Sequence, residues 1–267
     1  MLLLLSPLIL PTRATAGLAD QIGATFARMV DEFLKAFPAV EGLVVAVEGD
    51  RLYLDLSEKD RVQEGQEFTV FRKGEVFRHP LTQKPLGRYE ELLGYAQVRR
   101  VFPTYSEARY IRLNGGPGTR GGGAGARPED GVRITRGRIR VAVAPALDLT
   151  QARADLRRVP YMIAVALERS GRFLVADPQR VIDLFATEGV RVEALLVSPD
   201  KVVPLVRALE AAGFLVPVLL ARGGVTYLDV TWISAITGTA LFSKRRALAP
   251  PEPAEEQRFP WEPRAVD

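Results

Sequence analysis

The sequence predicts a two-domain fold: a small all-β barrel preceded by a helix, followed by an α/β domain with a mixed sheet. Strand signals follow one another closely between residues 43 and 111, with turn residues between them, as in small barrels and sandwiches. From residue 138 onward, strand patterns alternate with helical ones. The predicted parts are a signal peptide (1–16), the helix and barrel (17–113), a Gly/Arg-rich linker (114–137), the α/β domain (138–248) and a disordered Pro/Glu-rich tail (249–267).

Residues 1–16 have the pattern of an export signal. Leucine-rich runs form an apolar core, and Ala14-Thr15-Ala16 matches an A-x-A cleavage pattern, although no Lys or Arg precedes the apolar run. We expect cleavage after Ala16 and a periplasmic product, and an ordinary buried helix is the alternative. The run is shorter than the roughly 20 residues that span a bilayer, so we expect no transmembrane span in the mature chain.

Residues 17–37 predict an amphipathic helix that precedes the barrel. Its apolar residues recur at helical spacing, and Pro38 ends it because proline lacks the N–H that a helix needs. We expect this helix to pack across the barrel, because an exposed apolar stripe of that size is uncommon.

The barrel itself is predicted from five short strand patterns. These lie at residues 43–47, 51–55, 67–72, 95–101 and 106–111. Between the third and fourth, residues 79–87 form a long turn that Pro80 and Pro85 stiffen, which lowers the entropy lost when the turn becomes ordered on binding.

The segment between the two domains is predicted to be flexible and basic. Residues 114–125 are mostly glycine and have nothing large to bury. Between residues 109 and 140, eight arginines and two carboxylates give a net charge of +6, although the whole chain carries only +4. Such a stretch could meet an anionic partner. The candidate contacts are Arg133, Arg136, Arg138 and Arg140. A solvated linker with a charged strand edge is the alternative.

The second domain is predicted from helix starts and a final meander. Helices begin near Pro160, Asp177 and Ser198, where a proline or a capping residue marks the first turn. Strands are predicted at residues 139–144, 173–176, 214–220, 225–234 and 239–244. In the fourth of these, Leu228, Val230 and Trp232 share one face.

Sequence motifs for catalysis, metal binding or nucleotide binding are absent or incomplete in this chain. Cysteine is absent, which excludes disulfides, thiol catalysis and Cys-ligated zinc. Residues 116–121 match G-x-G-x-x-G, but no helix can start after them. Ser198 begins an S-x-x-K pattern without its companion motifs and is explained as a helix N-cap. His79, the only histidine, lies on a Pro-rich turn without a nucleophile elbow in the chain.

Two pairs of adjacent carboxylates complete the candidates for catalysis. Glu90-Glu91 and Glu129-Asp130 are sequence neighbours on predicted solvated turns, whereas glycosidase carboxylates must flank a cleft from opposite sides. We therefore assign no catalytic, cofactor-binding or metal-binding residue, and we predict that the protein is not an enzyme.

Two stretches resemble known families. Residues 37–110 resemble the carboxy-terminal barrel domain of flagellar assembly protein T. The residues that carry this resemblance are 42–47, 52–56, 62–68, 79–82, 94–98 and 106–109. Residues 139–247 resemble the α/β fold shared by the amino-terminal domain of TolB, the curli-secretion lipoprotein CsgG and the penicillin-binding-protein activator LpoB. This second resemblance is carried by residues 141–145, 172–177, 228–230 and 236–238.

These resemblances imply an envelope protein that binds other envelope components. The barrel precedes the α/β domain here, unlike in flagellar assembly protein T, and the chain lacks the anchoring Cys of CsgG and LpoB. We predict a non-enzymatic binding or assembly module, of the flagellar or outer-membrane assembly type. Its partners would be envelope proteins, and it would need no cofactor or small-molecule substrate.

Three further expectations remain open. A nucleic-acid binder using residues 109–140 is one alternative, less favoured because no strand face combines basic and aromatic residues. A cell-wall hydrolase with Ser198 is the other. For a protein partner, the strands at 106–111 and 239–244 are predicted edges, and Phe242 is the candidate residue for docking by strand addition.

Overall fold

Six strands close into a barrel in the computed structural model of this chain, which describes residues 17–113, 125–150, 155–199, 203–204 and 208–248. The predicted signal peptide, the tail and most of the glycine-rich segment lie outside these ranges. Around the barrel the order is β1 (Val40–Glu48), β2 (Arg51–Leu54), β5 (Ser106–Arg112), β4 (Pro85–Val101), β3 (Glu67–Arg78) and β6 (Gly131–Ile134). A short 3-10 helix, η1 (Glu58–Asp60), lies between β2 and β3. The predicted all-β barrel is confirmed.

Strand β6 lies where the composition predicts a linker, so that prediction is wrong for these residues. It pairs antiparallel with both β1 and β3 and thereby closes the barrel. Gly131 is required at this point, because a Cβ there would lie 2.3 Å from the ring of Phe71. A strand of four residues within a Gly/Arg-rich stretch is too short to show a periodic pattern.

The second domain contains the predicted mixed sheet. Its strand order is β12 (Ala240–Ala247), β11 (Val225–Ser234), β10 (Gly213–Arg222), β7 (Ile139–Val143) and β9 (Phe173–Val175), and β8 (Leu147–Asp148) pairs with β10. The first three strands are antiparallel, whereas β7 and β9 run parallel. The helices described here are α3 (Val159–Arg169), α4 (Pro178–Thr187) and α5 (Glu193–Val197). Most of the helix expected after Ser198 lies outside the described residues.

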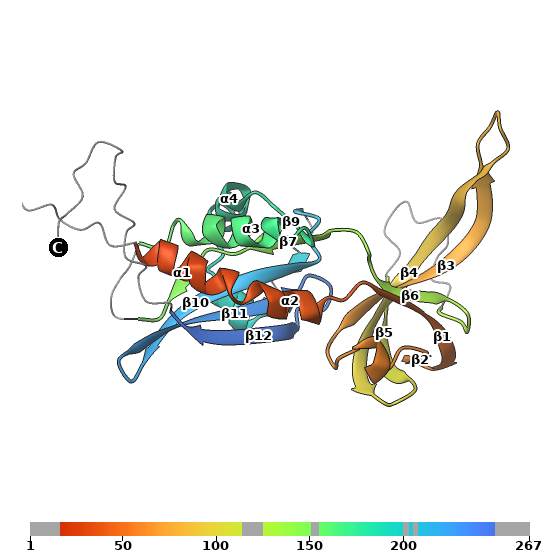
Figure 1. Cartoon of the computed structure of the whole chain (residues 1–267), viewed down its shortest axis with the longest axis horizontal. Helices are drawn as coiled ribbons and strands as arrows, with labels where there is room; N and C mark the ends of the chain where they lie inside the picture. Colours follow the sequence, from red (N-terminus) through yellow and green to blue (C-terminus); the bar gives the residue numbers. More distant parts are fainter. Residues whose placement is uncertain (1–16, 114–124, 151–154, 200–202, 205–207, 249–267) are drawn as a thin grey trace, which may run out of the picture.

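The amino-terminal helices cover the α/β domain and not the barrel (Figure 1). Helix α1 (Leu18–Ala27) packs on α3 so closely that a Cβ at Gly23 would lie 3.0 Å from Met162. In α2 (Val30–Ala36), Phe33 makes an edge contact with Phe242 of β12 at 4.7 Å between ring centroids. The expectation that this segment packs across the barrel is therefore wrong, because the sheet of the second domain offers the apolar surface that it covers.

The two domains meet through a shared apolar core. Phe37 leaves α2 and places its ring 4.3 Å from Trp232 and 6.1 Å from Phe173. On the polar side, Arg172 donates to the Phe37 carbonyl at 3.1 Å and Gln66 donates to the Ala36 carbonyl at 2.9 Å. Since these contacts join the barrel, the helices and the sheet, the two domains are held in one arrangement.

Candidate interaction surfaces

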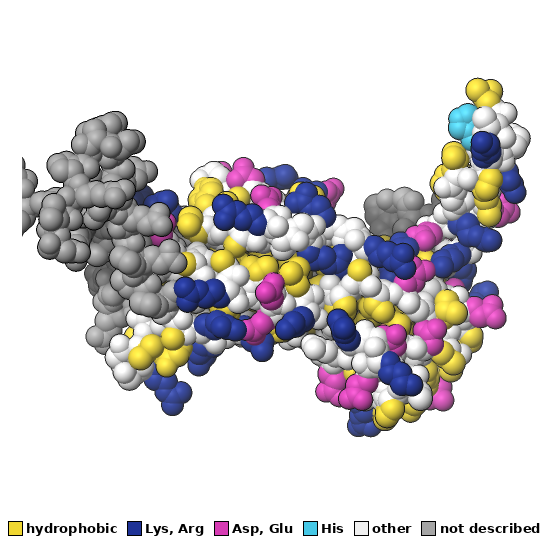
Figure 2. Space-filling model, viewed as in Figure 1, with side chains coloured by type: hydrophobic (Ala, Val, Ile, Leu, Met, Phe, Trp, Pro, Cys, Tyr) yellow, Lys and Arg dark blue, Asp and Glu magenta, His cyan; other side chains and the backbone are white. Residues whose placement is uncertain are grey.

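The long hairpin of β3 and β4 projects from the barrel, away from the α/β domain (Figure 1). We call residues 73–90 the arm, because no side chain in this range is buried. The sequence predicts a long turn at residues 79–87, but strand β4 already begins at Pro85. Large apolar side chains stay in solvent along the arm, and Leu81 at its tip is 87% exposed. Hydrophobic and basic side chains lie side by side there (Figure 2).

Hydrogen bonds close the tip of the arm on itself. The Nδ1 atom of His79 accepts from the backbone N–H groups of Leu81 and Thr82, each at 3.2 Å. The backbone of His79 also donates to the Lys84 carbonyl and accepts from the Gln83 N–H, both at 2.9 Å. The only histidine of the chain therefore shapes a turn and is not arranged for catalysis.

Three of the four predicted arginines line one cleft between the two domains. The cleft has a volume of about 860 Å³, and Arg133, Arg138 and Arg140 contribute to its wall together with Arg112. Arg136 is exposed and does not line the cleft. Two arginines of this wall bind carboxylates of the same chain. Arg133 donates to Glu90 at 2.9 Å, and Arg140 donates to Glu210 at 3.0 Å.

These contacts reduce the charge available to an external partner. The hydrogen bond that Arg133 donates to Glu90 raises the pKa of Arg133, whose guanidinium also lies 4.1 Å from the centre of the Phe71 ring. Arg138 donates its Nε to the Phe173 carbonyl at 2.9 Å. The basic segment that suggested a nucleic-acid site is therefore partly built into the junction between the domains. Its role as a contact surface stays a prediction.

Glu67 lies at this junction as a half-buried carboxylate. It accepts hydrogen bonds from Ser234 at 2.6 Å and from Thr237 at 2.7 Å, both from the α/β domain. Gln97 of the barrel donates to Glu67 at 3.4 Å and to Thr239 at 2.9 Å. Burial raises the pKa of Glu67, and the hydrogen bonds from Ser234 and Thr237 oppose that rise.

We expect the Glu67 carboxyl to make the stability of the protein depend on pH. Because the pKa of Glu67 is higher in the folded chain than in the unfolded one, folding disfavours the ionised form of its carboxyl. The ionised carboxylate of Glu67 therefore does not destabilise the protein below the unfolded pKa. Its destabilising effect grows as the pH rises from the unfolded pKa through the folded pKa. Thermal unfolding between pH 4 and 8 should show Glu67→Gln gaining stability relative to the wild type as the pH rises. A difference that does not change with pH would contradict this, and Glu64→Gln at an exposed neighbour serves as the control.

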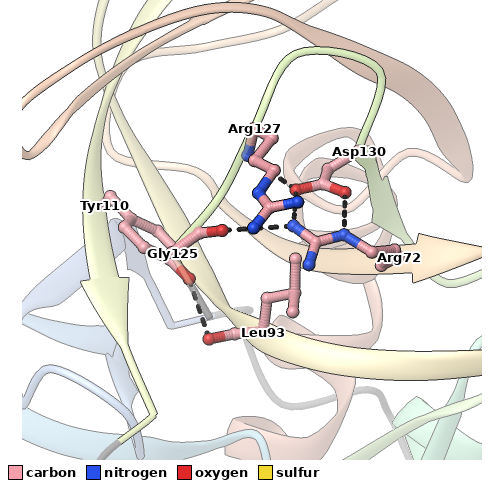
Figure 3. Close-up of polar contacts among 6 residues, drawn as sticks. All are labelled: Arg72, Leu93, Tyr110, Gly125, Arg127 and Asp130. Atoms are coloured by element: carbon pink, nitrogen blue, oxygen red, sulfur yellow. Dashed lines mark hydrogen bonds and ion pairs between the residues drawn. The ribbon is translucent and has the colours of Figure 1, made fainter. Parts of the chain in front are cut away.

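Another carboxylate, that of Asp130, is buried and fixes the start of β6 (Figure 3). Its oxygens accept from the Nε and Nη2 atoms of Arg72, both at 2.8 Å, and from the backbone N–H of Arg127 at 2.7 Å. Arg72 also donates to the Gly125 carbonyl at 3.1 Å. The ion pair with Asp130 raises the pKa of Arg72. The reading of Asp130 as part of a solvated turn is therefore wrong.

Only one of the two predicted edge strands is an edge. Strand β5 pairs with β2 on one side and β4 on the other, so the prediction of an edge at 106–111 is wrong. Strand β12 is the terminal strand of its sheet. Its Phe242 is half-buried on Phe33 of α2, and residues 243–247 after it are exposed. Strand addition at β12 stays a prediction.

The structure does not bring Ser198 and His79, the candidate residues of a hydrolase, together. Ser198 follows α5, where its backbone N–H bonds to the Ala194 carbonyl at 2.8 Å, whereas His79 lies at the tip of the arm. Within the described ranges, no three His, Cys, Asp or Glu side chains gather as a metal site would require. No helix of the described residues has both the length and the apolar character needed to cross a membrane.

Comparisons with known proteins give partial likenesses. No family model matches the chain. An uncharacterized protein of Aquifex aeolicus (strain VF5) is 35% identical over 90 residues, which is 34% of this chain and 18% of that protein. The LpoB C-terminal domain from Escherichia coli superposes on 42% of this chain and 83% of its own, with 16% identity and a TM-score of 0.36. Lipoprotein GNA1162 from Neisseria meningitidis covers 45% of this chain and 84% of its own, with 18% identity and a TM-score of 0.34.

LpoB, one of the proteins that residues 139–247 are predicted to resemble, is thus among the structures that superpose on part of this chain. At TM-scores this low, the likeness does not establish a shared fold. The resemblances to flagellar assembly protein T, TolB and CsgG stay predictions.

Proposed function

We propose that this chain is a non-enzymatic protein of the cell envelope that acts as a binding module. The observation that carries the proposal is the arm, which leaves large apolar side chains in solvent on a barrel that is firmly joined to its neighbouring domain. Exposed apolar groups of this kind mark contact sites for partners or membranes. The arm would dock on another envelope component while the rest of the molecule keeps its shape.

Periplasmic location, with cleavage after Ala16, belongs to the same proposal. So does binding to other envelope proteins in a flagellar or outer-membrane type of assembly. The exposed Arg136 and Arg138 and the edge of β12 are further candidate contacts, because each remains open to solvent. The export pattern of residues 1–16 and the lack of an assembled catalytic site among the described residues support this reading.

Cell fractionation combined with crosslinking tests the proposal. We expect tagged full-length protein in the periplasm, with an amino terminus at Gly17. A photo-reactive residue at Leu86 on the arm should form adducts with envelope components more strongly than one at Val197, an exposed apolar position on α5. An intact Met1 in the cytoplasmic fraction would contradict the proposal.

A further inference from the structure

We propose that the distal arm, residues 76–89, docks on the surface of an anionic phospholipid bilayer and inserts Leu81 below the headgroups. This inference rests on the proposed function and names the envelope component that the arm meets. Four features of the arm carry it: its apolar tip, the placement of apolar side chains on both faces, its charge, and the hydrogen bonds of its tip.

The apolar side chains lie on both faces of the hairpin. Val76 is paired with Arg88 and Phe77 with Gly87, and paired residues of a ladder share a face. Since side chains alternate along a strand, Val76 and Phe77 lie on opposite faces, and Tyr89 lies on the face of Phe77. The rings of Phe77 and Tyr89 confirm this, with centroids 5.1 Å apart. A protein groove commonly covers one face of a hairpin, whereas the interfacial region of a bilayer surrounds an inserted element on all sides.

The charge of the distal arm complements an anionic surface. Arg78, Lys84 and Arg88 are exposed, and residues 76–89 contain no carboxylate. Lys and Arg residues near an anionic membrane each contribute attraction that salt weakens. Their long side chains can keep the charge among the headgroups while apolar neighbours insert more deeply. Tyr89 has the amphipathic ring that is enriched at such interfaces.

Several backbone polar groups at the tip of the arm are hydrogen-bonded within the tip itself. Pro80 has no N–H, and the N–H groups of Leu81 and Thr82 are bonded to His79. The Pro80 carbonyl accepts from the Gln83 side chain at 3.0 Å, and the Gln83 carbonyl accepts from Arg78 at 3.1 Å. Unbonded polar groups are costly to remove from water, and these hydrogen bonds lower that cost for the N–H groups of Leu81 and Thr82 and for the Pro80 and Gln83 carbonyls.

Vesicle flotation with the purified full chain tests the inference. We expect binding to vesicles of phosphatidylglycerol and phosphatidylethanolamine, and at least tenfold weaker binding to phosphatidylcholine vesicles. Leu81→Asp removes the apolar insertion and Lys84→Glu reverses a charge, so each should weaken binding to anionic vesicles by about tenfold or more. Val225→Asp, at the exposed first residue of β11, should leave binding unchanged.

Insertion depth separates docking on lipid from simple attraction to a polyanion. In Leu81→Trp, the added fluorescence should be quenched by brominated acyl chains, and in Val225→Trp it should not. Absence of binding, equal binding to neutral vesicles, or binding without quenching would each overturn the inference. If these outcomes occurred while crosslinks from Leu86 to envelope proteins persisted, the proposed function would stand and the arm would be a protein-docking element.

Discussion

Replacing Asp130 with alanine is expected to lower the free energy of unfolding by about 3–5 kcal/mol. The carboxylate is almost fully buried and neutralises Arg72 through two hydrogen bonds. Its loss leaves the Arg72 guanidinium without its counter-charge and the Arg127 N–H without its acceptor. Because strand β6 begins at the next residue and closes the barrel, we expect the substitution to destabilise the whole barrel domain. Urea unfolding followed by circular dichroism measures the effect.

Two further variants show that the effect comes from the ion pair. Glu129→Gln changes the exposed neighbour and should shift stability by less than about 0.5 kcal/mol. Replacing both partners, with Arg72→Met and Asp130→Leu together, should be less damaging than Asp130→Ala, because the half-buried Arg72 charge is then not left without its partner. A stability of Asp130→Ala within about 1 kcal/mol of the wild type would contradict the assigned role.

The parts of the fold that the sequence predicts well are those with local signals. The β10–β12 meander follows from two glycines at a turn and from a strand with one apolar face, and Leu228, Val230 and Trp232 are buried as expected. The helical segment before the barrel is also clear from its spacing. The surface on which this segment packs is not clear from the sequence, because an amphipathic pattern indicates that one face is covered but not what covers it.

The features that the sequence does not disclose depend on distant partners. Asp130 is an ordinary loop carboxylate until the fold brings it to Arg72, which is 58 residues away in the chain. Glu67 is likewise an ordinary strand carboxylate until the fold brings it to Ser234, which is 167 residues away in the chain. The arm shows a different limit, because an exposed Leu81 and a buried leucine look the same in a sequence. The two prolines and the absence of carboxylates in residues 76–89 were the available signals.

Removal of the Trp232 side chain is the second large effect that we expect, with a loss of about 3–5 kcal/mol in Trp232→Ala. The ring is 1% exposed and packs against Phe37 and Phe173, so its loss opens a cavity where the barrel meets the α/β domain. Small-angle scattering under native conditions should then show a wider distribution of interdomain arrangements. Tyr89→Ala, which removes an exposed ring from the arm, should change stability by less than about 0.5 kcal/mol. Equal stability of Trp232→Ala and the wild type would mean that the domains are not held together through this aromatic contact. The arrangement of the domains would then rest on the hydrogen bonds that Glu67 and Gln97 make to the α/β domain.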